Sequence, residues 1–308
     1  MSRSKTVLIT GGTGLLALNW ACAIRDSWHV ILGTHQHSVK LNGVRSERVN
    51  LNSEEQFGCQ LDRLLPDLVV HTAGLANVDQ CEQNPDLAYQ SNTVIAGHVA
   101  RATASRNIPL IHISTDHLFV GDNCFYKETD QPHPLNEYGK TKLLAEELVL
   151  AAYPHSLIIR TNFFGWGHLQ RQSLSDWLIY MMREGKKLTL FDDVFFTPIL
   201  ADSLALTAHE LMEKDACGIF NFVGDERLSK YQFGLAVCQT FDLPISLVQR
   251  GQIEQSSLTT PRPRDMSLNN NKVRHLLGRG LGDVKQFLTT LHTQELEGRR
   301  NELLKAIC

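Results

Sequence analysis

Two side chains that could move a proton lie four residues apart near the middle of the chain. Tyr138 and Lys142 belong to the run NEYGKTK at 136–142, which leads into a helix-like segment. On a helix this spacing places both side chains on one face, with the ammonium beside the phenol. A nearby cation favours the phenolate and lowers the phenol pKa from about 10, as a general acid or base requires. The ordinary alternative is a surface pair that occurs by chance.

A third candidate follows the buried strand expected at 109–114. That strand ends in Ser114-Thr115-Asp116-His117, and ligands of open parallel sheets bind beyond the carboxyl ends of the strands. The Thr115 hydroxyl would then reach the same crevice as the other candidates and hydrogen-bond a reacting oxygen. Alone, a hydroxyl at a strand end is more often a turn or cap residue.

A glycine turn near the start of the chain has the layout of a phosphate site. The apolar run TVLIT at 6–10 is followed by Gly11-Gly12-Thr13-Gly14 and then by the helix-compatible segment 15–25. Glycines let the backbone approach a pyrophosphate, and the free amides of the helix N-terminus face the anion. The pattern predicts a dinucleotide site, with a merely structural turn as the alternative.

The end of the second expected strand, 30–33, bears on the choice of cofactor. It continues into Thr34-His35-Gln36-His37, where an NAD-preferring site would carry an Asp or Glu for the ribose hydroxyls. No carboxylate is present there, and Lys40 and Arg45 lie nearby. We therefore expect NADPH to be preferred, with NADH possible, unless these are solvated loop residues.

The remaining elements predict an α/β fold with a doubly wound parallel sheet. Apolar strands are expected at 48–51, 67–74 and 157–161, with a helix at 87–105 among them; near-continuous apolar strands of this kind are covered on both faces. From Gly165 onward the alternation is less regular, as in a smaller C-terminal substrate domain. We expect residues 1–165, with a return segment near 190–225, to form the NADP-binding Rossmann domain, and residues 166–189 and 226–308 to form the substrate-binding domain.

Composition narrows the function classes. The 308 residues carry a net charge of −3 with both signs interspersed, so no basic surface for nucleic acid or an anionic membrane is indicated. Seven scattered cysteines without a C-x-x-C pair suit a reducing cytoplasm. No metal-ligand spacing and no membrane-spanning apolar run are found. Whether the protein forms a homodimer is left open.

Taken together, these segments show a resemblance to a known family. The assembly of TGGTGLLA, HTAGLANVD, STDHLFVG, YGKTK and RTNFFGWG resembles the extended short-chain dehydrogenase/reductases, in the dTDP-4-dehydrorhamnose reductase branch. The resemblance implies that Tyr138 donates a proton, that Lys142 lowers its pKa and holds the nicotinamide ribose, and that Thr115 positions the carbonyl. The cofactor residues expected in this way are Gly11, Thr13, Gly14, Leu15, Leu16, His35, Asn50, Leu51, Ala73, Gly74, Leu75, Ser114, Tyr138 and Lys142.

The same resemblance implies a nucleotide-sugar substrate, held by Asp116, Phe163 and Arg262. Three positions depart from the branch: Asn50 stands where Asp is usual, His117 where Tyr is usual, and Phe163 where Trp is usual. The implied reaction is reduction of the C4 keto group of a nucleotide-linked 4-keto-6-deoxyhexose by NADPH. Two alternatives stay open. The chain also resembles the regulatory β subunit of methionine adenosyltransferase, and an epimerase or dehydratase of sugar nucleotides would use a similar fold.

Overall fold

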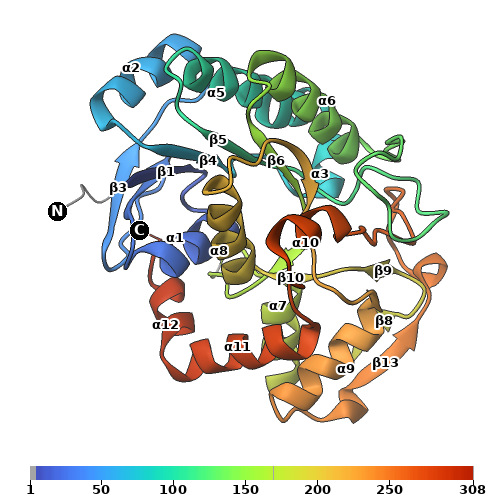
Figure 1. Ribbon diagram of the computed structural model, residues 1–308. Coiled ribbons are helices and arrows are strands. Elements are labelled where there is room, and N and C mark those ends of the chain that lie inside the picture. The colour runs from blue at the N-terminus through green and yellow to red at the C-terminus, as the bar shows by residue number, and fades with distance from the viewer. Residues whose placement is uncertain (1–4, 169, 308) are drawn as a thin grey trace.

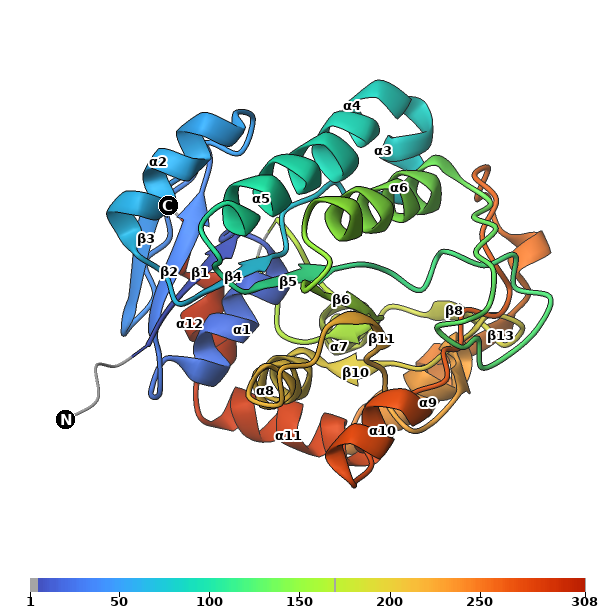
Figure 2. The ribbon, with the colours of Figure 1, turned by 45° about the horizontal axis from the view of Figure 1, so that its top comes forward.

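Seven parallel strands form the central sheet of the computed structural model, which describes residues 5–168 and 170–307. Figures 1 and 2 show this sheet wrapped by helices, with the later part of the chain gathered to one side. The strands in their order across the sheet are β11 (Gly218–Asn221), β6 (Leu157–Arg160), β5 (Leu110–Ile113), β4 (Leu68–His71), β1 (Thr6–Thr10), β2 (His29–Thr34) and β3 (Val44–Arg48). The predicted doubly wound α/β fold is confirmed.

Helices cover both faces of the sheet, which is why its inner strands are apolar on both sides. Along β1, Leu8 faces one hydrophobic cluster while Val7 and Ile9 face the other. Figure 1 shows the two helical layers on opposite sides of the sheet. The layers consist of α1 (Leu15–Ile24) with α8 (Ala201–Met212), and of α2 (Glu54–Leu64), α5 (Ile95–Ala104) and α6 (Glu137–Ala152).

The third strand begins four residues earlier than the sequence predicted. The prediction of a strand at 48–51 was wrong, because β3 pairs with β2 from Val44 to Arg48. This strand is the edge of the sheet and is mostly polar, so it shows no apolar run. The apolar Val49 and Leu51, on which the prediction relied, follow the strand and line a cavity instead.

A π-helical turn interrupts the helix expected at 87–105. The chain passes from α3 (Val78–Gln83) through α4 (Pro85–Tyr89) into the π-helical turn η1 (Gln90–Val94) and then into α5. Such turns often occur at functional sites, because the extra residue changes the direction of nearby side chains. Here the turn carries Asn92, whose contacts are described below.

Short strand pairs and helices complete the second half of the chain. The strand pairs are β7 (Phe163–Phe164) with β10 (Ile199–Leu200), β9 (Phe195–Phe196) with β12 (Leu228–Ser229), and β8 (Leu188–Phe191) with β13 (Val248–Gly251). The helices are α7 (Leu174–Arg183), α9 (Lys230–Thr240), α10 (Asn271–Leu277), α11 (Val284–Leu296) and α12 (Arg299–Leu304), with 3₁₀ turns η2 (Ile245–Leu247) and η3 (Ile253–Gln255). The expected N-cap, Ser229, forms a capping box with Gln232.

One hydrophobic cluster runs from the sheet into this second half. It joins Val7 and Ile9 of β1 to Leu178 of α7 and Phe233 of α9. The domain boundaries given above stay predictions. Within residues 5–168 and 170–307, no helix combines the length and apolar character that a membrane span requires.

Candidate active site

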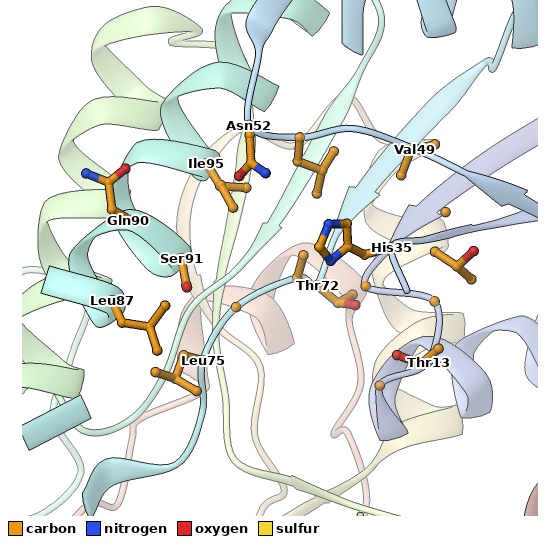
Figure 3. A pocket seen from close by; sticks show the side chains of 18 of the residues that line it. Thr13, His35, Val49, Asn52, Thr72, Leu75, Leu87, Gln90, Ser91 and Ile95 are labelled. Carbon is orange, nitrogen blue, oxygen red and sulfur yellow. The ribbon is translucent and has the colours of Figure 1, made fainter. Parts of the chain in front are cut away.

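A cavity of about 510 Å³ opens at the carboxyl ends of β1, β2 and β4. Figure 3 shows Thr13 and His35 on one side of it, and Leu87, Gln90 and Ser91 on the other. Eight residues that the sequence assigned to the cofactor line this cavity: Gly11, Thr13, Gly14, His35, Leu51, Ala73, Gly74 and Leu75. Its place at the strand ends is where open parallel sheets bind their ligands.

The glycine turn is built so that backbone faces the cavity. Gly11 has a φ of +67°, and a Cβ added there would lie 2.8 Å from the backbone of Ala73. Gly14 precedes α1, whose first turn has no acidic residue and no side-chain cap. The free amides of that helix end therefore suit an anion, and this part of the cavity fits the pyrophosphate of a dinucleotide.

Asn92 fixes the opposite wall of the cavity to the helix that carries Tyr138. Its Oδ1 accepts a 2.7 Å hydrogen bond from Leu75 N, and its Nδ2 donates to Leu75 O and to Thr141 Oγ1. A Cβ at Gly74 would lie 2.8 Å from the same Oδ1. The segment after β4 thus approaches the cavity as glycine and backbone, held by one buried amide.

At the end of β2 the cavity meets a smaller one of about 340 Å³, which fits the adenosine end of a dinucleotide. His35 lines both, and Arg48 and Asn50 line the smaller one. Arg45, which the sequence suggested for a 2′-phosphate, hydrogen-bonds Glu47 through its Nε at 2.9 Å. Arg48 is better placed than Arg45 to contact a 2′-phosphate, because it lines the small cavity. Sequence reasoning missed Arg48 because it placed this residue at the start of the strand predicted at 48–51.

Tyr138 lies next to Thr115 and His117 and is not among the residues that line this cavity. Burial raises the pKa of Tyr138 to about 12; a hydrogen bond from Thr115 opposes this shift, and the negative charge of Asp116 adds to it. The His117 ring packs edge-on against the phenol with centroids 5.6 Å apart. Within the protein itself the phenol is therefore held protonated, as a proton donor must be.

The Lys142 ammonium is directed to the end of β5. Its Nζ donates a 2.6 Å hydrogen bond to Ile113 O, and it is absent from the groups that shift the pKa of Tyr138. Burial lowers the pKa of Lys142 itself to about 8, while the charge of Glu146 opposes this shift. In the protein alone the ammonium is directed to the end of β5, so the expected effect of Lys142 on the pKa of Tyr138 stays a prediction.

The Ser114 side chain binds another side chain of the protein. Its hydroxyl donates a 2.5 Å hydrogen bond to Glu146 Oε1, and Glu146 forms a salt bridge with Arg160 at 2.7 Å, both side chains being 2% exposed. The pair joins α6 to β6 and, through Ser114, to the end of β5. Ser114 therefore supports the helix of Tyr138, and its side chain does not line the cavity.

Asp116 is buried beside Tyr138 and receives a 2.5 Å hydrogen bond from Asn162 Nδ2. Its charge also acts on Lys230, the first residue of α9, whose pKa burial lowers to about 8. The Lys230 ammonium lies over the ring of Phe196, 3.2 Å from its centroid. Sequence reasoning missed Lys230; the signal was a lysine directly after an N-cap serine, on a helix that begins at the site.

Phe163 and Arg262, the other two residues predicted to bind the substrate, both have partners within the protein. Phe163 is half-buried in β7 and packs against the main hydrophobic cluster. Arg262 forms a 2.8 Å salt bridge with Asp79 and also donates to Thr260 O. The segment around Arg262 is thereby tied to α3, and its charge reaches the site through its effect on the pKa of His117.

The structure thus brings most of the expected residues together in two neighbouring groups. The first lines the cavity; the second consists of Thr115, Asp116 and Tyr138 with Lys142 beneath them. Leu15 and Leu16 are buried in α1 and line neither cavity. Besides Arg48 and Lys230, sequence reasoning missed Arg171, which lines the large cavity from the loop after β7.

Comparison with known proteins gives consistent matches along the chain. The model of the RmlD substrate binding domain family matches residues 5–295. The probable low-salt glycan biosynthesis reductase Agl14 of Haloferax volcanii is 29% identical over 88% of this chain and 91% of its own. The methionine adenosyltransferase 2 subunit beta of Mus musculus is 30% identical over 93% of this chain and 86% of its own.

Solved structures agree with this fold. A dTDP-4-dehydrorhamnose reductase from Bacillus anthracis, in complex with NADP, has a TM-score of 0.84 and 21% identity, covering 94% of this chain and 99% of that one. A hypothetical dTDP-4-dehydrorhamnose reductase from Sulfolobus tokodaii has a TM-score of 0.79 and 29% identity, covering 91% and 98%. With its Rossmann-type sheet, glycine turn and Tyr-x-x-x-Lys helix, the chain belongs to the RmlD substrate binding domain family of extended short-chain dehydrogenase/reductases.

Proposed function

We propose that this protein reduces the C4 keto group of a nucleotide-linked 4-keto-6-deoxyhexose with NADPH. The observation that carries the proposal is the group formed by Tyr138, Thr115 and Asp116 at the end of β5, next to a glycine-lined cavity. The relatives support the reaction class, since one is a probable glycan biosynthesis reductase. NADPH supplies the hydride when bound.

The chain's own residues divide the remaining tasks. Tyr138 holds the proton that the forming alkoxide takes, and its raised pKa keeps that proton in place until charge develops on the substrate oxygen. Thr115 donates a hydrogen bond to the same oxygen, which stabilises the developing negative charge. Lys142 would hold the nicotinamide ribose of a bound cofactor and would supply positive charge on the Tyr138 side of the site.

The pocket side of this group suits a sugar. Asp116, Asn162 and Lys230 offer acceptors and donors for ring hydroxyls, and the aromatic rings of Phe163 and Phe196 lie in β7 and β9 beside them. Arg262 ties its own segment to α3 through Asp79. We assign residues 166–189 and 226–308 to substrate binding and the rest to the dinucleotide.

A second candidate is a regulatory subunit that binds NADP without turning over a sugar. It is favoured by the 30% identity to the methionine adenosyltransferase 2 subunit beta. Tyr138 and Lys142 alone do not separate the two functions, because a non-catalytic relative can keep both. Either function is compatible with a homodimer.

One assay separates them. The protein and NADPH are mixed with dTDP-, UDP- and GDP-linked 4-keto-6-deoxyhexoses, and loss of reduced-nicotinamide absorbance is followed for wild type and Tyr138→Phe. Turnover with one sugar, reduced at least ~100-fold in the variant while NADPH still binds, is the expected result. NADPH binding without turnover across the panel would contradict the reductase and favour the regulatory function.

A further inference from the structure

Arg171 has no place in the function described so far, although it lines the large cavity. The residues described around that cavity include no Asp or Glu, and Arg171 is the one Arg or Lys among them. It comes from the loop that follows β7, a part of the chain far in sequence from the glycine turn, and a positive charge in such a place suits an anionic ligand.

The loop that carries Arg171 is attached directly to the glycine turn. His168 Nε2 lies 3.0 Å from the backbone oxygen of Thr13, the residue between Gly12 and Gly14. Since a carbonyl only accepts, Nε2 carries the proton. Nδ1 then accepts from Gln170 N at 3.3 Å, as a neutral imidazole allows, and burial lowers the pKa of His168 toward that neutral form.

Backbone hydrogen bonds hold Arg171 close to His168. His168 and Arg171 exchange two backbone hydrogen bonds of 2.9 Å, so the chain reverses between them. Gly167 permits the close approach, because a Cβ there would lie 2.1 Å from Arg171 O. Gly167 N also donates to Asp176 in α7, and Ser173 Oγ donates to Gly165 O, which fixes both ends of the loop.

We propose that Arg171 binds a pyrophosphate oxygen of the dinucleotide, opposite the amides of the glycine turn, an assignment that rests on the proposed function. The contact with Thr13 places the loop at the pyrophosphate end of the cavity, whereas His35 and Arg48 lie at the adenosine end. His168 acts as a positioning residue. The dinucleotide is thus held from both halves of the chain.

The test is the dissociation constant of NADPH and of NADH, measured by nicotinamide fluorescence for wild type, Arg171→Ala and Arg171→Lys. Arg171→Ala should weaken both dinucleotides equally, by roughly tenfold or more, because both carry the pyrophosphate. Arg171→Lys should recover part of the affinity. The Arg171 side chain is exposed, so the variant should keep its circular dichroism spectrum and unfolding midpoint.

Two control variants isolate the contact. Gln172→Ala changes a neutral, exposed residue of the same loop, and Lys187→Ala removes an exposed charge that does not line the cavity. Both should bind like wild type. Unchanged affinity in Arg171→Ala would overturn the proposal while leaving the reductase intact, and a loss confined to NADPH would move Arg171 to the 2′-phosphate. A wild type that binds neither dinucleotide would overturn both.

Discussion

The ammonium of Lys142 donates a 2.6 Å hydrogen bond to the carbonyl oxygen of Ile113, the last residue of β5. This bond fixes α6, which carries Tyr138, against the strand end that carries Thr115. The same bond directs the Lys142 ammonium, which the sequence predicted beside the phenol of Tyr138, to the strand end. In the protein without cofactor, the pKa of Tyr138 is raised mainly by burial, and the charge of Asp116 adds to this shift.

The first prediction concerns the titration of Tyr138 in the protein without cofactor. The difference in phenolate absorbance between wild type and Tyr138→Phe should rise only near pH 12, since the pKa of this phenol is raised to about 12. Asp116→Asn should move the transition to lower pH, because it removes a negative charge that disfavours the phenolate. A wild-type transition at or below the ordinary value of about 10 would contradict this.

The second prediction concerns the buried pair of Glu146 and Arg160. Glu146→Ala leaves the Arg160 guanidinium buried without its partner and should lower the free energy of unfolding by about 3–5 kcal/mol in urea denaturation. The double variant Glu146→Leu, Arg160→Met should recover part of that loss, since no uncompensated charge remains. Glu137→Ala, which removes an exposed pair with Lys140, is the matched control and should cost less than about 1 kcal/mol.

Much of this arrangement could be predicted from the sequence. The β1 strand, the glycine turn and the helix with Tyr138 were foreseen because apolar periodicity, glycine punctuation and a Tyr-x-x-x-Lys spacing are local signals. The polar edge strand β3 was misplaced because its partner, β2, and not its own composition makes it a strand. Sequence reasoning missed Arg48, Arg171 and Lys230, because only the fold brings Arg48 and Arg171 to the two cavities and Lys230 close to Asp116.

The direction of the pKa shift at Tyr138 was likewise beyond the sequence. Spacing places Lys142 on the same helical face, but whether an ammonium turns to a phenol or to a strand-end carbonyl depends on which oxygen lies closer after packing. Burial then decides the sign, because it disfavours the charged form of both groups.

The third prediction concerns the pH dependence that Lys230 imposes on stability. Its pKa falls from 10.5 to about 8 on folding, so between these values the unfolded chain binds more protons and stability rises with pH. In urea denaturation, the free energy of unfolding of Lys230→Met should therefore exceed that of wild type by roughly 1–3 kcal/mol at about pH 7, and by less near pH 10. An equal difference at both pH values would show that the ammonium is already well solvated in the native protein.

The fourth prediction concerns the choice between NADPH and NADH. His35 and Arg48 line the small cavity at the end of β2, and no carboxylate is among the residues described around it. Arg48→Ala should raise the dissociation constant of NADPH by about tenfold and leave that of NADH nearly unchanged, because only NADPH carries the 2′-phosphate. Arg45→Ala is the matched control, since Arg45 is already paired with Glu47.

The same experiment separates the two ends of the dinucleotide. Introducing a carboxylate by His35→Asp should favour NADH, because an acid at this position hydrogen-bonds the ribose hydroxyls and repels a phosphate. Arg171→Ala should by contrast weaken both cofactors, so the ratio of their dissociation constants stays as in wild type. A wild type that binds NADH as tightly as NADPH would overturn the preference, and with it the role of Arg48.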